Sequence, residues 1–171
     1  QKGGALEGIQ LWLNLPAEKK MIEANYQHVA NEDFKTVTSD DKKVNIQIIA
    51  GELEGVYGRV KTQSPVNAFM ITVEAGGGHE IKVPNSHQST VYLLKGDVTI
   101  NDSETLKLDA NQLIQFNQDG DHIKIFANEK SKVLFLSGEP LKETVATYGP
   151  YVMNTQTELL EAMRDYQQGK M

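Results

Sequence analysis

The side chains best suited to hold a metal ion in this sequence are four histidines, at positions 28, 79, 87 and 122. Imidazole combined with a carboxylate suits iron, manganese or nickel. Alternate residues of a β-strand point to the same side, so two histidines separated by one residue can share such a site. No two of these four have that spacing. His79, Glu80 and His87 are candidates for an unusual site, although Pro84 interrupts any strand pairing between them. Taken singly, each histidine is better explained as a surface or hydrogen-bonded structural residue.

Other kinds of catalytic or binding site have little support. The sequence has no cysteine, which excludes disulfides, thiolate zinc sites and cysteine nucleophiles. Gly76-Gly77-Gly78 precedes a strand pattern rather than a helix, so we do not interpret it as a phosphate-binding loop. The G-x-S-x-G, H-E-x-x-H and calcium-loop motifs are also missing.

The charge pattern argues against direct nucleic-acid binding. The chain has 17 basic and 23 acidic side chains, a net charge of −6, and Arg59 and Arg164 are its only arginines. Nonspecific duplex binding requires a basic face instead. No apolar run approaches the ~18 residues of a membrane span. We therefore expect a cytoplasmic protein with no nucleic-acid or membrane contact.

Short strands separated by turns dominate the chain. Val44–Ile48 alternates polar and apolar residues, whereas Phe69–Val73 is apolar on both faces and should be central. Lys95-Gly96-Asp97 and Asp119-Gly120-Asp121 are typical turns. Further expected strands are His79–Val83, Val91–Leu94, Val98–Ile100, Leu106–Leu108, Leu113–Phe116, Ile123–Phe126 and Val133–Leu136. Strands at ~8–12-residue spacing favour an all-β sandwich or barrel, the group that includes jelly rolls and cupins.

The two ends of the chain carry the remaining elements. Ile9–Leu15 alternates, with Leu11 and Leu13 on one face and Trp12 on the other, which predicts a strand that Pro16 ends.

A C-terminal helix should begin with a capping box formed by Thr155 and Glu158. Its apolar stripe consists of Leu159, Ala162, Met163 and Tyr166.

The metal motifs of cupin barrels can be tested by spacing. The first motif is Gly-x5-His-x-His-x3-Glu-x6-Gly, and the second is Gly-x5-Pro-x-Gly-x2-His-x3-Asn. Starting the first at Gly77 places its closing glycine on Gly96, but its ligand positions become Val83, Asn85 and Ser89. Starting the second at Asn111 leaves only His122 in a ligand position. One imidazole does not hold a first-row metal, so we expect no metal or cofactor in this chain.

Specific short sequence motifs occur near both ends of the chain. Gly8–Pro16 reads GIQLWLNLP and is followed by Tyr26-Gln27; Ser137–Leu141 reads SGEPL, and Tyr148–Thr155 reads YGPYVMNT. These segments closely resemble the G-x-Q-L-W-x-N-L-P, G-E-P and Y/H-G-P-F-V-M-N-T words of the pirin family, in the family's order. Asp165-Tyr166-Gln167 also ends the helix as in pirins.

The resemblance implies a two-cupin protein of which this chain is the C-terminal half. In the family, three histidines and a glutamate of the N-terminal cupin hold the metal, usually iron, and the C-terminal cupin generally has none. The chain starts after that ligand region, so no metal ligand can be carried over. The family's activities, a quercetin-type dioxygenase reaction and a transcription-cofactor role, depend on that metal, and a small aromatic substrate is implied.

These observations lead to four expected segments: a strand or linker from the first cupin (1–16), a connecting excursion (17–40), the cupin barrel (41–153) and the helix (154–171). Trp12, Leu11 and Leu13 should form an interface with the N-terminal cupin or, by strand exchange, with a second copy. Two alternatives remain open: a free-standing module that binds a small ligand or a protein, and a dioxygenase with an atypical site at His79, His87 or His122.

Overall fold

The chain forms two compact units in a computed structural model that describes residues 3–4, 7–107, 109 and 112–170. The barrel unit consists of Ala24–Leu141. The terminal unit joins the segment that ends at Glu23 to the segment that begins at Lys142. Residues 142–153 belong to the same unit as the helix in this division.

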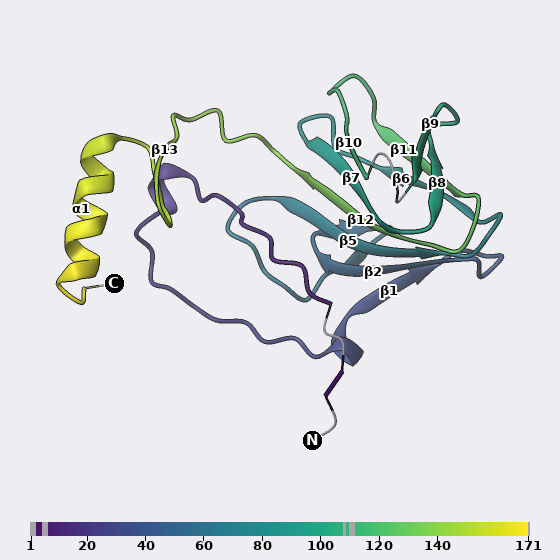
Figure 1. The fold of residues 1–171 in the computed structure, drawn as a ribbon, viewed down its shortest axis with the longest axis horizontal. Helices are drawn as coiled ribbons and strands as arrows, with labels where there is room; N and C mark the ends of the chain where they lie inside the picture. Colours follow the sequence, from purple (N-terminus) through teal and green to yellow (C-terminus); the bar gives the residue numbers. More distant parts are fainter. Residues whose placement is uncertain (1–2, 5–6, 108, 110–111, 171) are drawn as a thin grey trace. The chain divides into compact units, whose positions relative to one another are not determined.

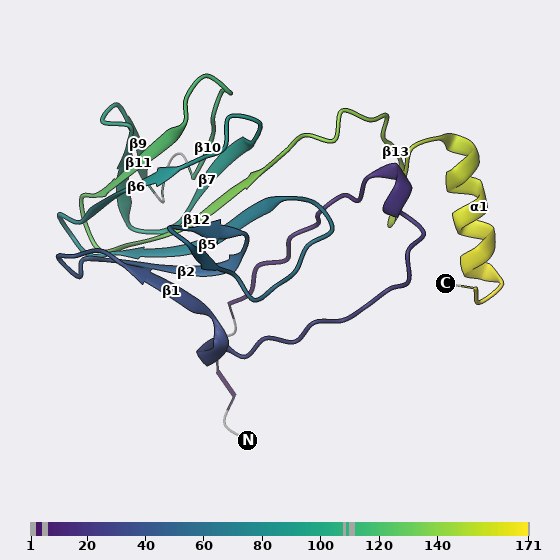
Figure 2. The ribbon, with the colours of Figure 1, turned by 180° about the vertical axis from the view of Figure 1, so that it is seen from behind.

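Two antiparallel sheets make up the barrel unit and face each other (Figures 1 and 2). The six-stranded sheet has the order β1 (Lys35–Thr38), β2 (Val44–Ala50), β5 (Val66–Val73), β12 (Ser131–Gly138), β7 (Gln88–Lys95) and β10 (Leu113–Gln115). The four-stranded sheet has the order β6 (Gly78–Lys82), β11 (His122–Ala127), β8 (Asp97–Ile100) and β9 (Glu104–Lys107). A short hairpin, β3 (Glu52–Leu53) with β4 (Val56–Tyr57), and a 3-10 turn, η2 (Asn31–Asp33), complete the unit.

The core lies between the two sheets because their strands alternate buried and exposed residues. Every second residue of β2 is buried, from Val44 to Ala50, as the sequence pattern predicts. Phe69 of β5 and Phe135 of β12 are directly paired across the two strands, and their rings stack with centroids 5.3 Å apart. Both are fully buried. The expected all-β fold with a C-terminal helix is confirmed.

The stretch before η2 is irregular and is fastened by one side chain. The amide of Gln27 donates to the carbonyl of Lys61 at 2.8 Å, and its Oε1 accepts from the Lys61 N–H at 2.9 Å. Gln27 thus binds both the backbone N–H and the backbone C=O of one residue, which fixes the path of a segment outside the sheets. This gives Gln27, part of the pirin-like Tyr26-Gln27 word, a structural role.

The terminal unit contains η1 (Ala17–Lys19), the hairpin of β13 (Ala146–Tyr148) and β14 (Tyr151–Met153), and α1 (Gln156–Gln167). The predicted capping box is confirmed: the Thr155 hydroxyl accepts from the Glu158 N–H, and the Glu158 carboxylate accepts from the Thr155 N–H. Glu143 joins the two segments of this unit, since its Oε2 accepts from the backbone N–H of Ala17 and from the side chain of Asn154, each at 2.9 Å. No helix in the described part of the chain is long and apolar enough to cross a membrane.

Two expectations about elements are wrong. Residues 9–15 have no strand structure, because the alternation describes a strand only when a neighbouring strand supplies hydrogen bonds. The connecting excursion contains β1, which forms the edge of the large sheet. The polar sequence of β1 conceals it, since edge strands face water. The expected strand at 106–108 and the motif start at Asn111 reach residues outside the described ranges.

Candidate functional site

The cupin metal positions do not come together as a metal site. Val83 is buried and apolar, Asn85 is exposed, and Ser89 is buried with no partner for its Oγ among the described residues. His122 lies at the surface of β11, where Asp121 Oδ1 is 2.8 Å from its Nδ1. In the described ranges, no three histidine, aspartate or glutamate side chains gather as metal ligands would. The donor set therefore does not fit the metal that the pirin family implies.

The unusual site considered for His79, Glu80 and His87 is not assembled either. His79 Nε2 lies 3.2 Å from Glu54 Oε1 of the β3–β4 turn, without the geometry of a hydrogen bond. Glu80 points outward from β6. His87 follows the turn after β6 and is only 9% exposed. Of the three, His87 alone has the burial expected of a functional side chain.

A chain of hydrogen bonds across the large sheet fixes the His87 ring. The Glu52 N–H donates to Asn67 Oδ1 at 3.2 Å, and Asn67 Nδ2 donates to Ser137 Oγ at 3.2 Å. Ser137 Oγ lies 3.1 Å from His87 Nδ1. The Ser137 hydroxyl, which accepts from Asn67, can either donate its hydrogen to Nδ1 or accept a second bond from Nδ1–H. When Ser137 donates to Nδ1, a neutral imidazole carries its proton on Nε2.

Gly51 makes this chain of hydrogen bonds sterically possible. Its φ is +86°, and a Cβ at this position would lie 2.9 Å from the Cα of Asn67 and even closer to Asn67 Oδ1 and the Val66 carbonyl. Only glycine combines this conformation with so close an approach of two backbones. Gly51 thereby brings the Glu52 N–H to Asn67.

His87 lines an open pocket of about 720 Å³ at one end of the barrel. Tyr57, Pro65, Val83 and Pro84 supply apolar walls, and one lysine and two carboxylates, Lys82, Glu52 and Asp121, supply the charged groups. The volume is within the range of ~300–1,000 Å³ that small-molecule sites occupy. The pocket and the fixed imidazole form the candidate site.

We predict that His87 makes the stability of the protein fall in mild acid. Burial lowers the pKa of His87 from its usual 6.5, although the nearby Glu139 carboxylate opposes the shift. Below pH 6.5 the unfolded chain therefore takes up a proton that the folded protein does not, and the free energy of unfolding falls until the folded pKa is passed. Urea unfolding at about pH 7.5 and about pH 5.5 measures this loss. His87→Gln should reduce it, whereas His28→Gln, at an exposed position, should not; equal losses in both variants would contradict the prediction.

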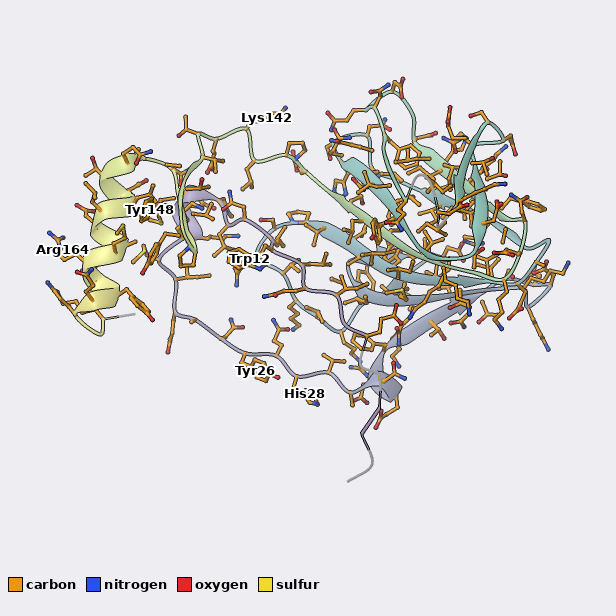
Figure 3. All side chains as sticks on the ribbon, viewed as in Figure 1. Trp12, Tyr26, His28, Lys142, Tyr148 and Arg164 are labelled. Carbon is orange, nitrogen blue, oxygen red and sulfur yellow. The ribbon has the colours of Figure 1, made fainter. Side chains whose placement is uncertain are left out.

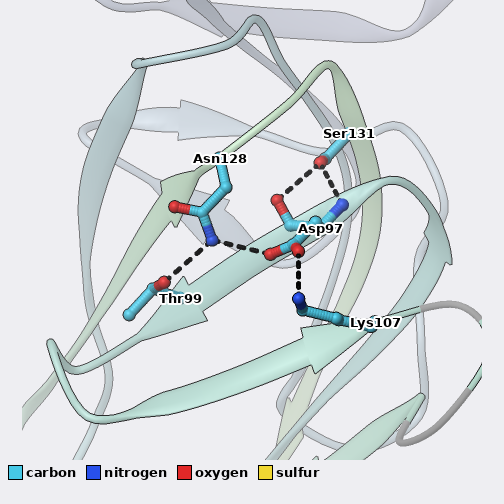
Figure 4. A network of polar contacts seen from close by, with 5 residues as sticks. All are labelled: Asp97, Thr99, Lys107, Asn128 and Ser131. Atoms are coloured by element: carbon cyan, nitrogen blue, oxygen red, sulfur yellow. Dashed lines mark hydrogen bonds and ion pairs between the residues drawn. The ribbon is translucent and has the colours of Figure 1, made fainter.

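A second polar cluster, around Asp97, is structural (Figure 4). Asn128 Nδ2 donates to Asp97 Oδ1 at 2.6 Å and to Thr99 Oγ1 at 3.1 Å, while Lys107 lies 3.3 Å from the other Asp97 oxygen. The hydrogen bond from Asn128 lowers the pKa of Asp97, with the contact to Lys107 adding to the effect. Ser131 Oγ accepts from the Asp97 N–H. The cluster satisfies its own groups and ties β8, β9 and β12 together.

The predicted interface residues lie on an irregular segment of the terminal unit. Trp12 is 70% exposed, and Leu11 and Leu13 are each about half exposed. Figure 3 labels Trp12 on this segment. Trp12 and Leu13, with Pro150 and Val152, border an open hollow of about 380 Å³. Apolar side chains gathered in this way are typical of a contact surface.

The sequence prediction missed Gly51, Asn67 and Ser137. Asn67 and Ser137 occupy directly opposite positions on β5 and β12. The available signal is weak, because each is simply a polar residue next to the end of its strand. Their role becomes visible only when the strands pair.

Two facing antiparallel sheets with a shared apolar core define a cupin-type jelly roll. The fold matches the crystal structure of a quercetin 2,3-dioxygenase from Acinetobacter baumannii, with a TM-score of 0.86 and 34% identity over 93% of this chain and 55% of that chain. Residues 68–171 match the family model "Pirin C-terminal cupin domain". The chain therefore belongs to the pirin family, as its C-terminal cupin domain.

Named relatives are longer than this chain. A pirin-like protein of Solanum lycopersicum is 32% identical over 98% of this chain and 57% of its own length. Pirin of Homo sapiens is 31% identical over 95% of this chain and 56% of its own length. The chain thus spans a little more than half of the curated relatives it matches.

Proposed function

We propose that this domain is the structural C-terminal half of a cytoplasmic two-cupin protein. The metal-dependent reaction, of the quercetin 2,3-dioxygenase type, belongs to an N-terminal cupin that holds iron or another divalent metal. The main support for this proposal is the identity of the residues at the four cupin ligand positions. Three of them are Val83, Asn85 and Ser89, and only the fourth, His122, is a metal-binding residue type. The greater length of the tomato and human relatives supports it.

The position of His122 adds a geometric argument. Its imidazole is at the surface, 47% exposed, and its Nδ1 is already bound to Asp121. A single exposed imidazole binds a first-row metal too weakly to retain it, because a stable metal site in a protein needs several ligands. The domain therefore supplies structure and contact surface rather than the metal.

Metal analysis and oxygen uptake test whether the metal belongs to the N-terminal cupin rather than to this domain. The purified 171-residue chain should contain far less than one iron per chain. With quercetin it should consume no more oxygen than the same mixture without protein, whether or not iron(II) is added. Joining it to the N-terminal cupin of a pirin relative should give a protein that binds iron, and His122→Ala should leave that iron in place. Stoichiometric iron in the 171-residue chain, lost on His122→Ala, would overturn the proposal.

We further propose that Leu11, Trp12 and Leu13 contact the N-terminal cupin or, in its absence, a second copy of this chain. Their exposure supports this, since burying large apolar side chains is the main driving force of association. Gel filtration with light scattering should show self-association of the 19.0 kDa chain. Trp12→Ser should shift it to monomer, whereas Tyr26→Ser, at an exposed aromatic residue of the barrel unit, should not. A strictly monomeric parent chain would contradict the contact.

A further inference from the structure

We propose that the pocket at His87 is a metal-independent binding site for a neutral, planar small molecule that presents a carbonyl or similar acceptor oxygen. His87 Nε2–H donates to that oxygen, and the apolar walls contact the planar body. The proposal concerns the barrel unit alone and does not depend on iron or on a dioxygenase reaction elsewhere.

The donor is fixed before any ligand arrives. Ser137 holds Nδ1 of the ring at 3.1 Å, and Asn67 holds Ser137 at 3.2 Å. The amide of Asn67 is itself oriented by the backbone N–H of Glu52. These contacts fix the orientation of the ring, and in the proposed tautomer Ser137 donates to Nδ1 while Nε2 carries the proton.

The donor is also without a partner. His87 is 9% exposed, and the only hydrogen bond of its side chain in the described part of the chain is the one at Nδ1. His87 Nε2 is not among the fully buried unpartnered atoms of the described residues, so solvent reaches it from the pocket. A ligand that brings an acceptor oxygen can take the place of that water at Nε2.

The surroundings select a neutral molecule. Asp121 and Glu52 together outnumber Lys82 among the charged groups that line the pocket. Asp121 is also paired with His122, which lowers its pKa and keeps it ionised. This net negative rim repels anions, so phosphate and carboxylate ligands are disfavoured. A planar body fits between Tyr57, Pro65 and Pro84, which offer flat apolar surfaces.

Acetophenone and ethylbenzene form a matched pair of probes, because they have the same ring and similar size but only acetophenone has an acceptor oxygen. The isotope-labelled chain, treated with a chelator, is titrated with each while side-chain nitrogen NMR spectra of the histidines are recorded. Before addition, His87 should show the Nε2–H tautomer. Acetophenone should then shift His87 Nε2 and should bind roughly threefold to tenfold more tightly than ethylbenzene, the range that one hydrogen bond provides.

Variants separate the donor from the pocket. His87→Phe keeps a ring but has no donor. In this variant the ratio of the affinities for acetophenone and ethylbenzene should be close to one. Ser137→Ala keeps the imidazole but frees its tautomer, and should reduce the preference; it serves as the test if His87→Phe does not fold. His28→Ala, at an exposed position that does not line the pocket, should change neither the tautomer nor the preference. Equal binding of the two probes, an Nδ1–H tautomer, or an undiminished preference in the folded donor variants would overturn the proposal, whatever the iron content of the chain.

Discussion

Gly51→Ala should unfold the protein more easily and release the imidazole of His87, whereas Gly55→Ala should do much less. Both glycines have a positive φ, +86° and +81°, so alanine is conformationally strained at both positions. At Gly55 the added Cβ would have open space, but at Gly51 it would collide with Val66 and Asn67. The comparison therefore isolates the collision from the conformational strain.

The expected difference in the free energy of unfolding between the two variants is about 1–3 kcal/mol, the usual cost of overpacking. Urea unfolding followed by fluorescence measures it. Nitrogen NMR of His87 gives a second measurement: Gly51→Ala should produce a mixture of tautomers, and Gly55→Ala should keep the parent spectrum. Equal stability and equal spectra for the two variants would show that Gly51 does not position the Glu52–Asn67 bond.

The second large effect is expected at Phe135. Its ring is fully buried in β12 and stacks on Phe69. Phe135→Ala removes that contact and leaves a cavity in a close-packed core, which costs about 3–5 kcal/mol. For a chain of 171 residues this corresponds to a fall in melting temperature of roughly 10 °C.

Phe126→Ala is the matched control, because Phe126 also lies on a central strand of its sheet but is 44% exposed. Loss of the Phe126 ring should lower the free energy of unfolding by well under half as much as loss of the Phe135 ring. Differential scanning calorimetry of the two variants and the parent chain provides the comparison. Similar losses for both would mean that Phe135 is not at the centre of the core.

Much of the fold could be predicted because local patterns and tertiary structure agree. Val44–Ile48 alternates in sequence and in burial, and Thr155 with Glu158 caps the helix by contacts only three residues apart. Ile9–Leu15 has an equally clear pattern, yet it forms no strand. An alternating pattern indicates which side chains prefer burial. A strand also needs a hydrogen-bond partner from elsewhere in the chain, and the local pattern does not indicate whether that partner exists.

The candidate site was predictable only in part. His87 stood out by residue type, as a metal ligand, but its actual contacts come from strands far apart in the sequence: Asn67 and Ser137 are separated by 70 residues. No local spacing encodes such a contact. Gly51 has its role only because Asn67 approaches it closely, and that approach exists only once the sheet has formed.

The terminal unit has a consequence for synthesis on the ribosome. Its two segments meet through Glu143, Ala17 and Asn154, yet they are translated several seconds apart at about 5–20 residues per second. The barrel unit lies between them as one continuous stretch, Ala24–Leu141, and can fold as it emerges. The contact of Ala17 with Glu143 cannot form until residue 143 has left the exit tunnel. A pause in translation before residue 142 would therefore lengthen the time during which the first segment lacks its partner in the terminal unit.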